Sequence, residues 1–201
     1  MDIEFFYDYR SPYAYLANTQ LGALGADIVY EPVNILAVMQ AVNNQPTPLC
    51  PPKARYAGID AARWAKHYSV AFSPNRALLQ AMAASQFDGT LLSRAALAAQ
   101  QLGVFANAHK ALFEAVWASD ADLVSVDGRK AFFTGRGVAA HEVWRLALDA
   151  SIAELLANAD RKAVERGVFG VPTFVVGGEL FFGNDRLNFV KARALGRDSR
   201  L

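Results

Sequence analysis

Strand patterns are confined to the two ends of this chain, and that distribution limits the folds open to it. Residues 2–8 combine aromatic and β-branched side chains, as do residues 28–33. Between residues 35 and 156 almost no strand signal is present, and it returns only at residues 173–176 and 179–182. A two-stranded piece of sheet is marginally stable alone, so strands from both ends are expected to pair. The sequence therefore predicts an α/β fold with one small sheet and a helical insertion.

The links between these strands predict how the sheet is connected. The Ser11-Pro12 pair is typical of a helix start, with serine as the N-cap and proline at the first helical position. A strand, a helix and a second strand in that order favour a parallel pair with a right-handed crossover. The Gly177-Gly178 pair predicts a hairpin between the last two strands. We expect residues 1–35 and 157–201 to form a discontinuous sheet domain, and residues 36–156 to form the all-helical insertion.

Helix and loop boundaries follow from glycine, proline and capping residues. The first helix is expected to end within residues 22–25, where glycine occurs twice. Residues 43–53 contain four prolines, which predicts a long irregular loop. Asn184 or Asp185 is expected to cap a final helix over residues 186–195.

Composition excludes several classes of partner. The chain has 201 residues, of which 53% are hydrophobic, so it can bury a sizeable core. Its formal net charge of +1 gives no electrostatic reason to expect binding to nucleic acid or to an anionic membrane. No apolar run reaches the roughly 18–20 residues that a membrane span needs. The acidic start lacks the basic segment of a signal peptide, and we expect a soluble cytoplasmic protein.

Cysteine and histidine usage narrows the chemistry. Cys50 is the single cysteine, so neither an intramolecular disulfide nor dithiol chemistry by this chain alone is possible. We interpret it as a passive loop thiol. The histidines at positions 67, 109 and 141 show no ligand spacing, and we expect no metal site.

Ser11 has two interpretations. A serine before proline is an ordinary helix cap, worth roughly 1 kcal/mol. Its hydroxyl would also lie among unpaired N–H groups at a helix start, an environment that favours an anion such as a thiolate. Serine is a poor nucleophile without a neighbouring base, and no histidine lies in a local motif that would supply one. We therefore interpret Ser11 as a candidate hydrogen-bond donor to a bound thiolate.

Two segments near the C-terminal end are candidates for holding a peptide-like ligand. Pro172 precedes a strand, where proline is tolerated because it has no N–H to donate. If the Val171-Pro172 bond is cis, the Val171 backbone becomes a free strand edge that an extended ligand can pair with. Asn184 and Asp185 are either helix caps or part of a ligand-binding site. In such a site a side-chain carboxylate would bind an ammonium group of the ligand, and helix N–H groups would bind a carboxylate of the ligand.

Three segments together resemble the 2-hydroxychromene-2-carboxylate isomerases, a family that groups with kappa-class glutathione transferases and bacterial disulfide oxidases. They are residues 6–18, 167–173 and 182–187, and the resemblance extends over nearly the whole chain. Residues 60–65 and 73–75 also look like family features. The resemblance implies a thioredoxin-like fold with an inserted all-helical domain.

The resemblance also implies a cofactor and its ligands. Ser11 stands where redox relatives carry the first cysteine of a C-x-x-C pair, and Ala14 stands where they carry the second. The implied cofactor is glutathione, with Ser11 as the catalytic residue and Pro172 as a cis-proline. Glutathione is implied to bind Ser11, Val171, Pro172, Phe182, Gly183, Asn184 and Asp185.

The implied substrate is a small aromatic molecule that lies between the two domains, near Lys53 and Asn75. The implied reaction is cis–trans isomerisation of 2-hydroxychromene-2-carboxylate to trans-o-hydroxybenzylidenepyruvate, by reversible addition of the glutathione thiolate. Such an enzyme would act in the breakdown of aromatic hydrocarbons, and a homodimer is a possible assembly.

The chain departs from the family pattern at three places. Arg10 is charged where an apolar residue is expected, residues 43–53 do not clearly reproduce the substrate loop, and residues 38–40 lack a basic residue for the substrate carboxylate. Two alternatives stay open. One is a kappa-like transferase or peroxidase that uses the same thiolate on other electrophiles. The other is a non-enzymatic thioredoxin-like binding module in which Ser11 only caps a helix.

Overall fold

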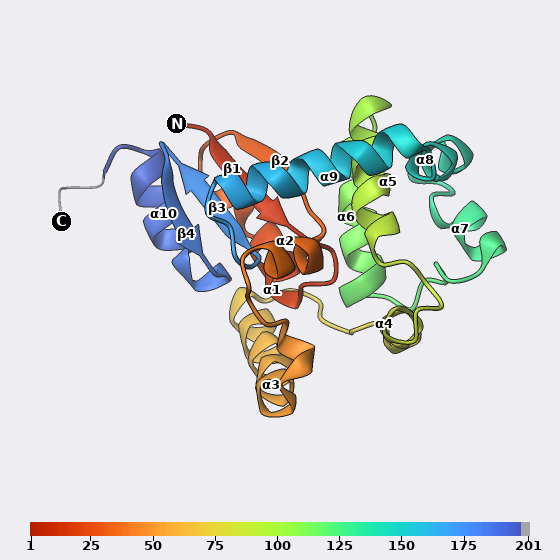
Figure 1. Cartoon of the computed structure of the whole chain (residues 1–201), viewed down its shortest axis with the longest axis horizontal. Helices are drawn as coiled ribbons and strands as arrows, with labels where there is room; N and C mark the ends of the chain where they lie inside the picture. The colour runs from red at the N-terminus through yellow and green to blue at the C-terminus, as the bar shows by residue number, and fades with distance from the viewer. Residues whose placement is uncertain (198–201) are drawn as a thin grey trace. The chain divides into compact units, whose positions relative to one another are not determined.

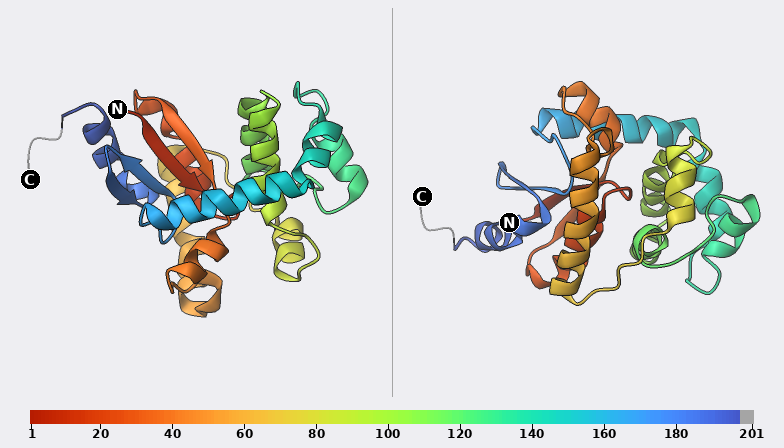
Figure 2. Two further views of the ribbon diagram at one scale, coloured as in Figure 1. Left: turned by 45° about the horizontal axis from the view of Figure 1, so that its top comes forward. Right: turned by 90° about the horizontal axis from the view of Figure 1, so that it is seen from below.

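The computed structural model describes residues 1–197 and has one mixed sheet of four strands (Figure 1). They are β1 (Ile3–Tyr7), β2 (Ile28–Pro32), β3 (Thr173–Val176) and β4 (Glu179–Phe182), in the spatial order β2-β1-β3-β4. β1 pairs parallel with β2 and antiparallel with β3, and β3 and β4 form an antiparallel hairpin. Strands from the two ends of the chain lie side by side in Figures 1 and 2, which confirms the predicted sheet.

Helices fill the rest of the described chain. They are α1 (Pro12–Asn18), α2 (Ile35–Ala41), α3 (Pro51–Tyr68), α4 (Arg76–Ala83), α5 (Thr90–Gln101), α6 (Phe105–Trp117), α7 (Val126–Phe132), α8 (Ala140–Ala147), α9 (Ala150–Glu165) and α10 (Leu187–Ala194). Single 3₁₀ turns are η1 (Leu21–Ala23), η2 (Thr47–Leu49) and η3 (Asn184–Arg186). Among residues 1–197, no helix is both long enough and apolar enough to cross a membrane.

The chain forms two compact units whose boundaries differ from the predicted ones. The first unit contains Met1–Val70 together with the chain from Ala159 onward, and the second contains Ala71–Asn158. The insertion therefore begins after Val70 rather than after residue 35. The physical reason is that α2 and α3 belong to the sheet unit: α2 contributes Ile35 and Val38 to the core on the sheet, and α3 packs on α1.

The two central strands, β1 and β3, are buried on both faces. The core on one face joins residues of β1, β3, α2 and α9, namely Phe6, Val33, Ile35, Val38, Ala163, Val168 and Val175. Because side chains alternate along a strand, Phe5 and Tyr7 point to the opposite face. There the Phe5 ring stacks on Tyr7 and on Phe174, with centroids 5.1 and 5.2 Å apart, and α10 packs against β3. A sheet covered on both faces holds its strand ends in fixed positions.

The second unit is a helical bundle in which α5 packs against α6 and α8. Its fully buried side chains include Leu92, Leu112, Phe113, Val143 and Ile152. Alanines at four buried positions of α5 allow neighbouring helices to approach closely.

Three local expectations were wrong. The first helix ends at Asn18, before the predicted glycines, and continues as the 3₁₀ turn η1. The predicted loop at residues 43–53 is shorter, because the prolines at 51 and 52 occupy the first turn of α3, where a missing N–H costs nothing. Neither Asn184 nor Asp185 caps α10: both lie in η3, and α10 follows Arg186.

Candidate active site at the start of helix α1

Ser11 joins the start of α1 to the segment before β3. Its backbone is extended (φ −93°, ψ 116°), and its Oγ accepts a hydrogen bond from the Ala14 N–H at 3.2 Å. The same hydroxyl donates to the Val171 carbonyl at 3.3 Å. A hydroxyl donor usually approaches to about 2.7–2.8 Å, so this second bond is long and weak. The hydroxyl hydrogen of Ser11 can therefore rotate toward a better acceptor with little loss of hydrogen-bond energy.

The Val171-Pro172 peptide bond is cis in the structure, as the resemblance implied. The Val171 side chain is half-buried, and its backbone N–H donates to no residue among 1–197. The Pro172 carbonyl accepts a hydrogen bond from the Gly183 N–H at 2.9 Å. This bond ties the β4–η3 turn to the segment that faces Ser11.

The Gly183–Asp185 turn has one buried and one exposed side chain. Asn184 is 4% exposed, and its carbonyl accepts a hydrogen bond from the Tyr68 hydroxyl at 3.0 Å. The Asp185 carboxylate is exposed and pairs with Arg186 at 2.7 Å. Gly183 has φ +109° and ψ 151°, a conformation essentially restricted to glycine. This turn therefore presents a carboxylate to solvent next to α1, with which η3 is in contact.

Aromatic side chains flank the same segment. The Phe182 ring lies against Phe169, with centroids 4.7 Å apart, and both rings are about two-fifths exposed. A Cβ on Gly170 would lie 2.7 Å from the Phe182 ring, so glycine at 170 allows the ring to lie there. The predicted residue Phe182 thus borders the Val171 segment, and Phe169 joins it as a residue that the sequence reading missed.

The loop that carries Ser11 is held by a fully buried carboxylate. Asp8 accepts hydrogen bonds from the Arg10 and Ile35 backbone N–H groups at 2.9 and 3.0 Å, and its own carbonyl accepts the Ser11 N–H at 3.0 Å. The Arg10 guanidinium pairs with the same carboxylate and donates to Asn34 Oδ1 at 2.8 Å. The charge at position 10, which departs from the family pattern, therefore neutralises a buried charge two residues earlier.

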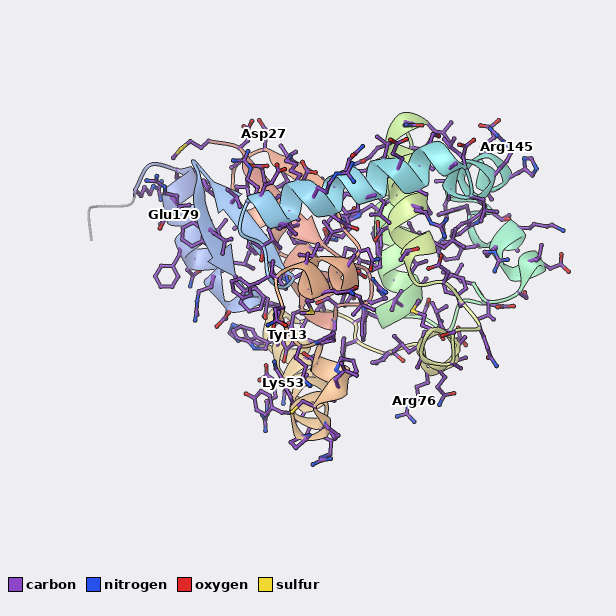
Figure 3. All side chains as sticks on the ribbon, in the orientation of Figure 1. Tyr13, Asp27, Lys53, Arg76, Arg145 and Glu179 are labelled. Atoms are coloured by element: carbon purple, nitrogen blue, oxygen red, sulfur yellow. The ribbon has the colours of Figure 1, made fainter. Side chains whose placement is uncertain are left out.

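Tyr13 and Asp60 lie beside this loop and were not singled out from the sequence. The Tyr13 hydroxyl donates to Asp60 Oδ2 at 3.0 Å, which joins α1 to α3, and Figure 3 labels Tyr13. Burial raises the pKa of Tyr13 above its usual value, and the nearby carboxylates of Asp60 and Asp185 raise it further. The phenol therefore stays protonated at neutral pH, and it cannot act as a base there.

The two predicted substrate residues lie in different units. Lys53 is exposed near the start of α3 in the first unit, where Figure 3 labels it, and it pairs with no residue among 1–197. Asn75 is 5% exposed and caps α4 in the second unit. Its Oδ1 accepts the Leu78 N–H at 3.1 Å, and its Nδ2 donates to two backbone carbonyls at 3.0 and 2.9 Å. These bonds use the Asn75 amide locally, and a role toward substrate stays a prediction for both residues.

No other catalytic group is apparent in the described residues. Within residues 1–197 no three His, Cys, Asp or Glu side chains are placed to hold a metal ion. His109 lies in α6, stacked on Phe105 with centroids 4.7 Å apart, and burial lowers its pKa to about 3. It is a core residue of the second unit. The hydroxyl of Ser11 and the backbone of Val171 stay the candidate groups for the chemistry.

Residues 2–194 match the DSBA-like thioredoxin domain. The chain belongs to that family. Within it, the chain is 30% identical to a 2-hydroxychromene-2-carboxylate isomerase from Pseudomonas putida, over 98% of this chain and 95% of that one. It is 28% identical to a protein of the same name from Sphingobium xenophagum, over 96% and 97% of the two chains. These DSBA-like relatives make the chain an enzyme and support an isomerase role.

Solved structures agree with this membership. The structure of a 2-hydroxychromene-2-carboxylate isomerase superposes with a TM-score of 0.81 at 26% identity, over 98% of this chain and 95% of that one. A cytosolic disulfide reductase, DsbM from Pseudomonas aeruginosa, solved with GSH, superposes with a TM-score of 0.65 at 17% identity, over 98% of both chains. The second likeness shows the DSBA-like fold alone. The predicted thioredoxin-like α/β fold is confirmed.

Proposed function

We propose that this chain is a glutathione-dependent cis–trans isomerase that converts 2-hydroxychromene-2-carboxylate to trans-o-hydroxybenzylidenepyruvate. The observation that carries the proposal is the Ser11 hydroxyl, which caps α1 and faces the Val171 carbonyl in a chain related to named isomerases. No cysteine stands at position 11 or 14, so the sulfur has to come from a bound thiol. We place the reaction in the cytoplasm, in the breakdown of aromatic compounds.

The Ser11 hydroxyl is the group that we assign to the thiolate. Its bond to Val171 is long, so exchange for a sulfur anion costs little. α1 is only seven residues long, so its dipole is a smaller contributor than the hydroxyl. A hydrogen bond to the anion lowers the pKa of the thiol, and each unit of lowering corresponds to about 1.36 kcal/mol. Near neutral pH such a change raises the thiolate fraction several-fold.

The rest of glutathione would extend from Ser11 toward the Gly183–Asp185 turn. The unpaired Val171 N–H supplies a donor to the cysteinyl unit, as in strand addition. The exposed Asp185 carboxylate is suited to the ammonium of the γ-glutamyl unit, and Phe182 covers an apolar part of the peptide. These contacts fix the sulfur in place, and that positioning lowers the entropic barrier of the addition.

The chemistry is an addition followed by an elimination. The thiolate forms a carbon–sulfur bond to the conjugated enone of the ring-opened substrate, and the electron pair of the double bond moves to the carbonyl oxygen as an enolate. The former double bond is now single and rotates. The enolate then collapses, the carbon–sulfur bond breaks, and the thiolate leaves with the trans double bond restored. Ser11 stabilises the sulfur anion before the addition and after the elimination.

Two measurements test this proposal directly. We expect glutathione to bind the native chain in calorimetry with a dissociation constant on the order of micromolar to millimolar. We also expect absorbance to show isomerisation of 2-hydroxychromene-2-carboxylate only when glutathione is present. Isomerisation without glutathione would show that the reaction does not depend on this cofactor. Binding without isomerisation, together with conjugation of an aromatic halide, would indicate a transferase instead.

Gly183→Ala tests the turn that we assign to the glutamyl unit. Alanine at this φ costs about 1–3 kcal/mol of stability, and its Cβ would lie 2.5 Å from Asp185 Oδ1, so the carboxylate has to move. We expect glutathione affinity in calorimetry to fall at least tenfold. Gly178→Ala is the matched control, because Gly178 also has a positive φ but lies at the other end of the β3–β4 hairpin. An equal loss of affinity in the two variants would contradict the assignment.

A further inference from the structure

A pocket lies within the first unit, at the end of α1 away from Ser11. It has a volume of about 250 Å³, and residues after α1, residues of α3 and residues of α10 form its walls. The seven residues of α1 rise about 1.5 Å each, so the two ends of the helix are about 10 Å apart. The pocket is therefore centred away from the sulfur position proposed above, although Asn184 and Asp185 border it.

Three aromatic side chains of α3 form one wall of this pocket. Trp64 lies one helical turn before the adjacent residues His67 and Tyr68, and the three rings contact one another with centroids 5.3 to 5.5 Å apart. Trp64 is half-exposed, whereas Trp117 and Trp144 are 6% and 7% exposed. Aromatic rings of this kind bind a planar ring by offset or edge-on stacking.

Two polar groups of the pocket have unused hydrogen-bonding capacity. Asn184 is 4% exposed, its Nδ2 lies 3.4 Å from the Tyr68 hydroxyl, and its Oδ1, which keeps some contact with solvent, accepts no hydrogen bond from residues 1–197. Lys191 Nζ donates to the Ala23 carbonyl at 2.7 Å and has no carboxylate partner among the same residues. The pocket thus offers a solvent-accessible acceptor on η3 and a cation on α10.

We propose that this pocket binds a single-ring hydroxyaromatic carboxylate, with the ring against Trp64, the carboxylate on Lys191 and the hydroxyl donating to Asn184. A volume of about 250 Å³ suits one ring and its substituents and is below the usual range for larger ligands. An acceptor without a partner among residues 1–197 is available to a ligand that brings a donor. The proposal does not depend on glutathione or on the isomerase reaction.

The test follows the indole N–H signals of the native chain by NMR during titration with 4-hydroxybenzoate. The chain has three tryptophans, and Trp64→Phe identifies the signal that belongs to the pocket. We expect the Trp64 signal to shift with a dissociation constant on the order of 1 mM, as expected for a ligand of this size, while the other two signals stay in place. An unmoved Trp64 signal at about ten times that concentration would overturn the proposal.

Charge-matched variants test the role assigned to Lys191. Lys191→Met is expected to weaken 4-hydroxybenzoate about three- to fivefold, which is the range for an exposed ion pair, and to leave neutral 4-methylphenol unaffected. Lys66→Met is the control, since Lys66 is exposed on α3 but does not line the pocket. Equal weakening by the two variants would overturn the role of Lys191.

Discussion

Ser11→Ala is expected to lower the rate of glutathione-dependent isomerisation about 10- to 100-fold. The variant loses a hydrogen bond to an anion, which contributes about 1.5–3 kcal/mol. Glutathione affinity in calorimetry should change little, because Val171 and the Gly183–Asp185 turn hold the peptide. The pH profile is the sharper readout: the thiolate absorbance of bound glutathione should appear at higher pH in the variant, since the donor that lowers the thiol pKa is absent.

Two controls separate this effect from the loss of the helix cap. Ser11→Ala removes the cap of Ala14 and costs about 1 kcal/mol of stability, whereas Ser11→Gly removes the same hydroxyl and costs only a few tenths. If the hydroxyl acts on sulfur, both variants are slow, and Ser11→Thr restores most of the rate. A glycine variant as fast as the native enzyme would show that the cap alone matters at position 11.

Asp8→Ala is expected to destabilise the chain by about 2–4 kcal/mol in urea unfolding. The substitution leaves the partly buried Arg10 guanidinium without its carboxylate and removes the acceptor of the buried Ile35 N–H. Breaking a buried ion pair on one side typically costs 3–5 kcal/mol. We place the value lower because the Arg10 side chain is 18% exposed and keeps its bond to Asn34.

A double-mutant cycle tests whether Asp8 and Arg10 act as a pair. Asp8→Asn and Arg10→Met are each expected to destabilise, and the double variant should lose clearly less than the sum of the two, by about 1–3 kcal/mol. Additive losses would show that the two side chains act independently. Since the Ser11 N–H is bonded to the Asp8 carbonyl, the single variants should also slow isomerisation in the temperature range where they stay folded.

Local chemistry made the strands, the Ser11 cap and the Gly177-Gly178 hairpin predictable. In each of these the cause lies within a few consecutive residues, such as a serine before a proline or two glycines between apolar runs. The pairing of the chain ends was also predictable, because strands that short need a partner. Asn75 shows the limit of this reasoning: the resemblance placed the substrate near it, but only the structure shows that its side chain caps α4 and is bonded to α6 and to the loop beyond α6. Its role toward substrate stays a prediction.

The sequence by itself determined where the four strands lie, that the two ends share one sheet, and that the protein has no second thiol with which to form a disulfide. Only the tertiary structure decided that Asp8, Arg10 and Asn34 form one network beneath Ser11, and that α2 and α3 belong to the sheet unit. The physical reason is how far apart in the sequence the interacting residues are. Helix caps and turns depend on neighbours in sequence, but the partner of a buried charge or an exposed helix face is chosen by whatever the folded chain brings next to it.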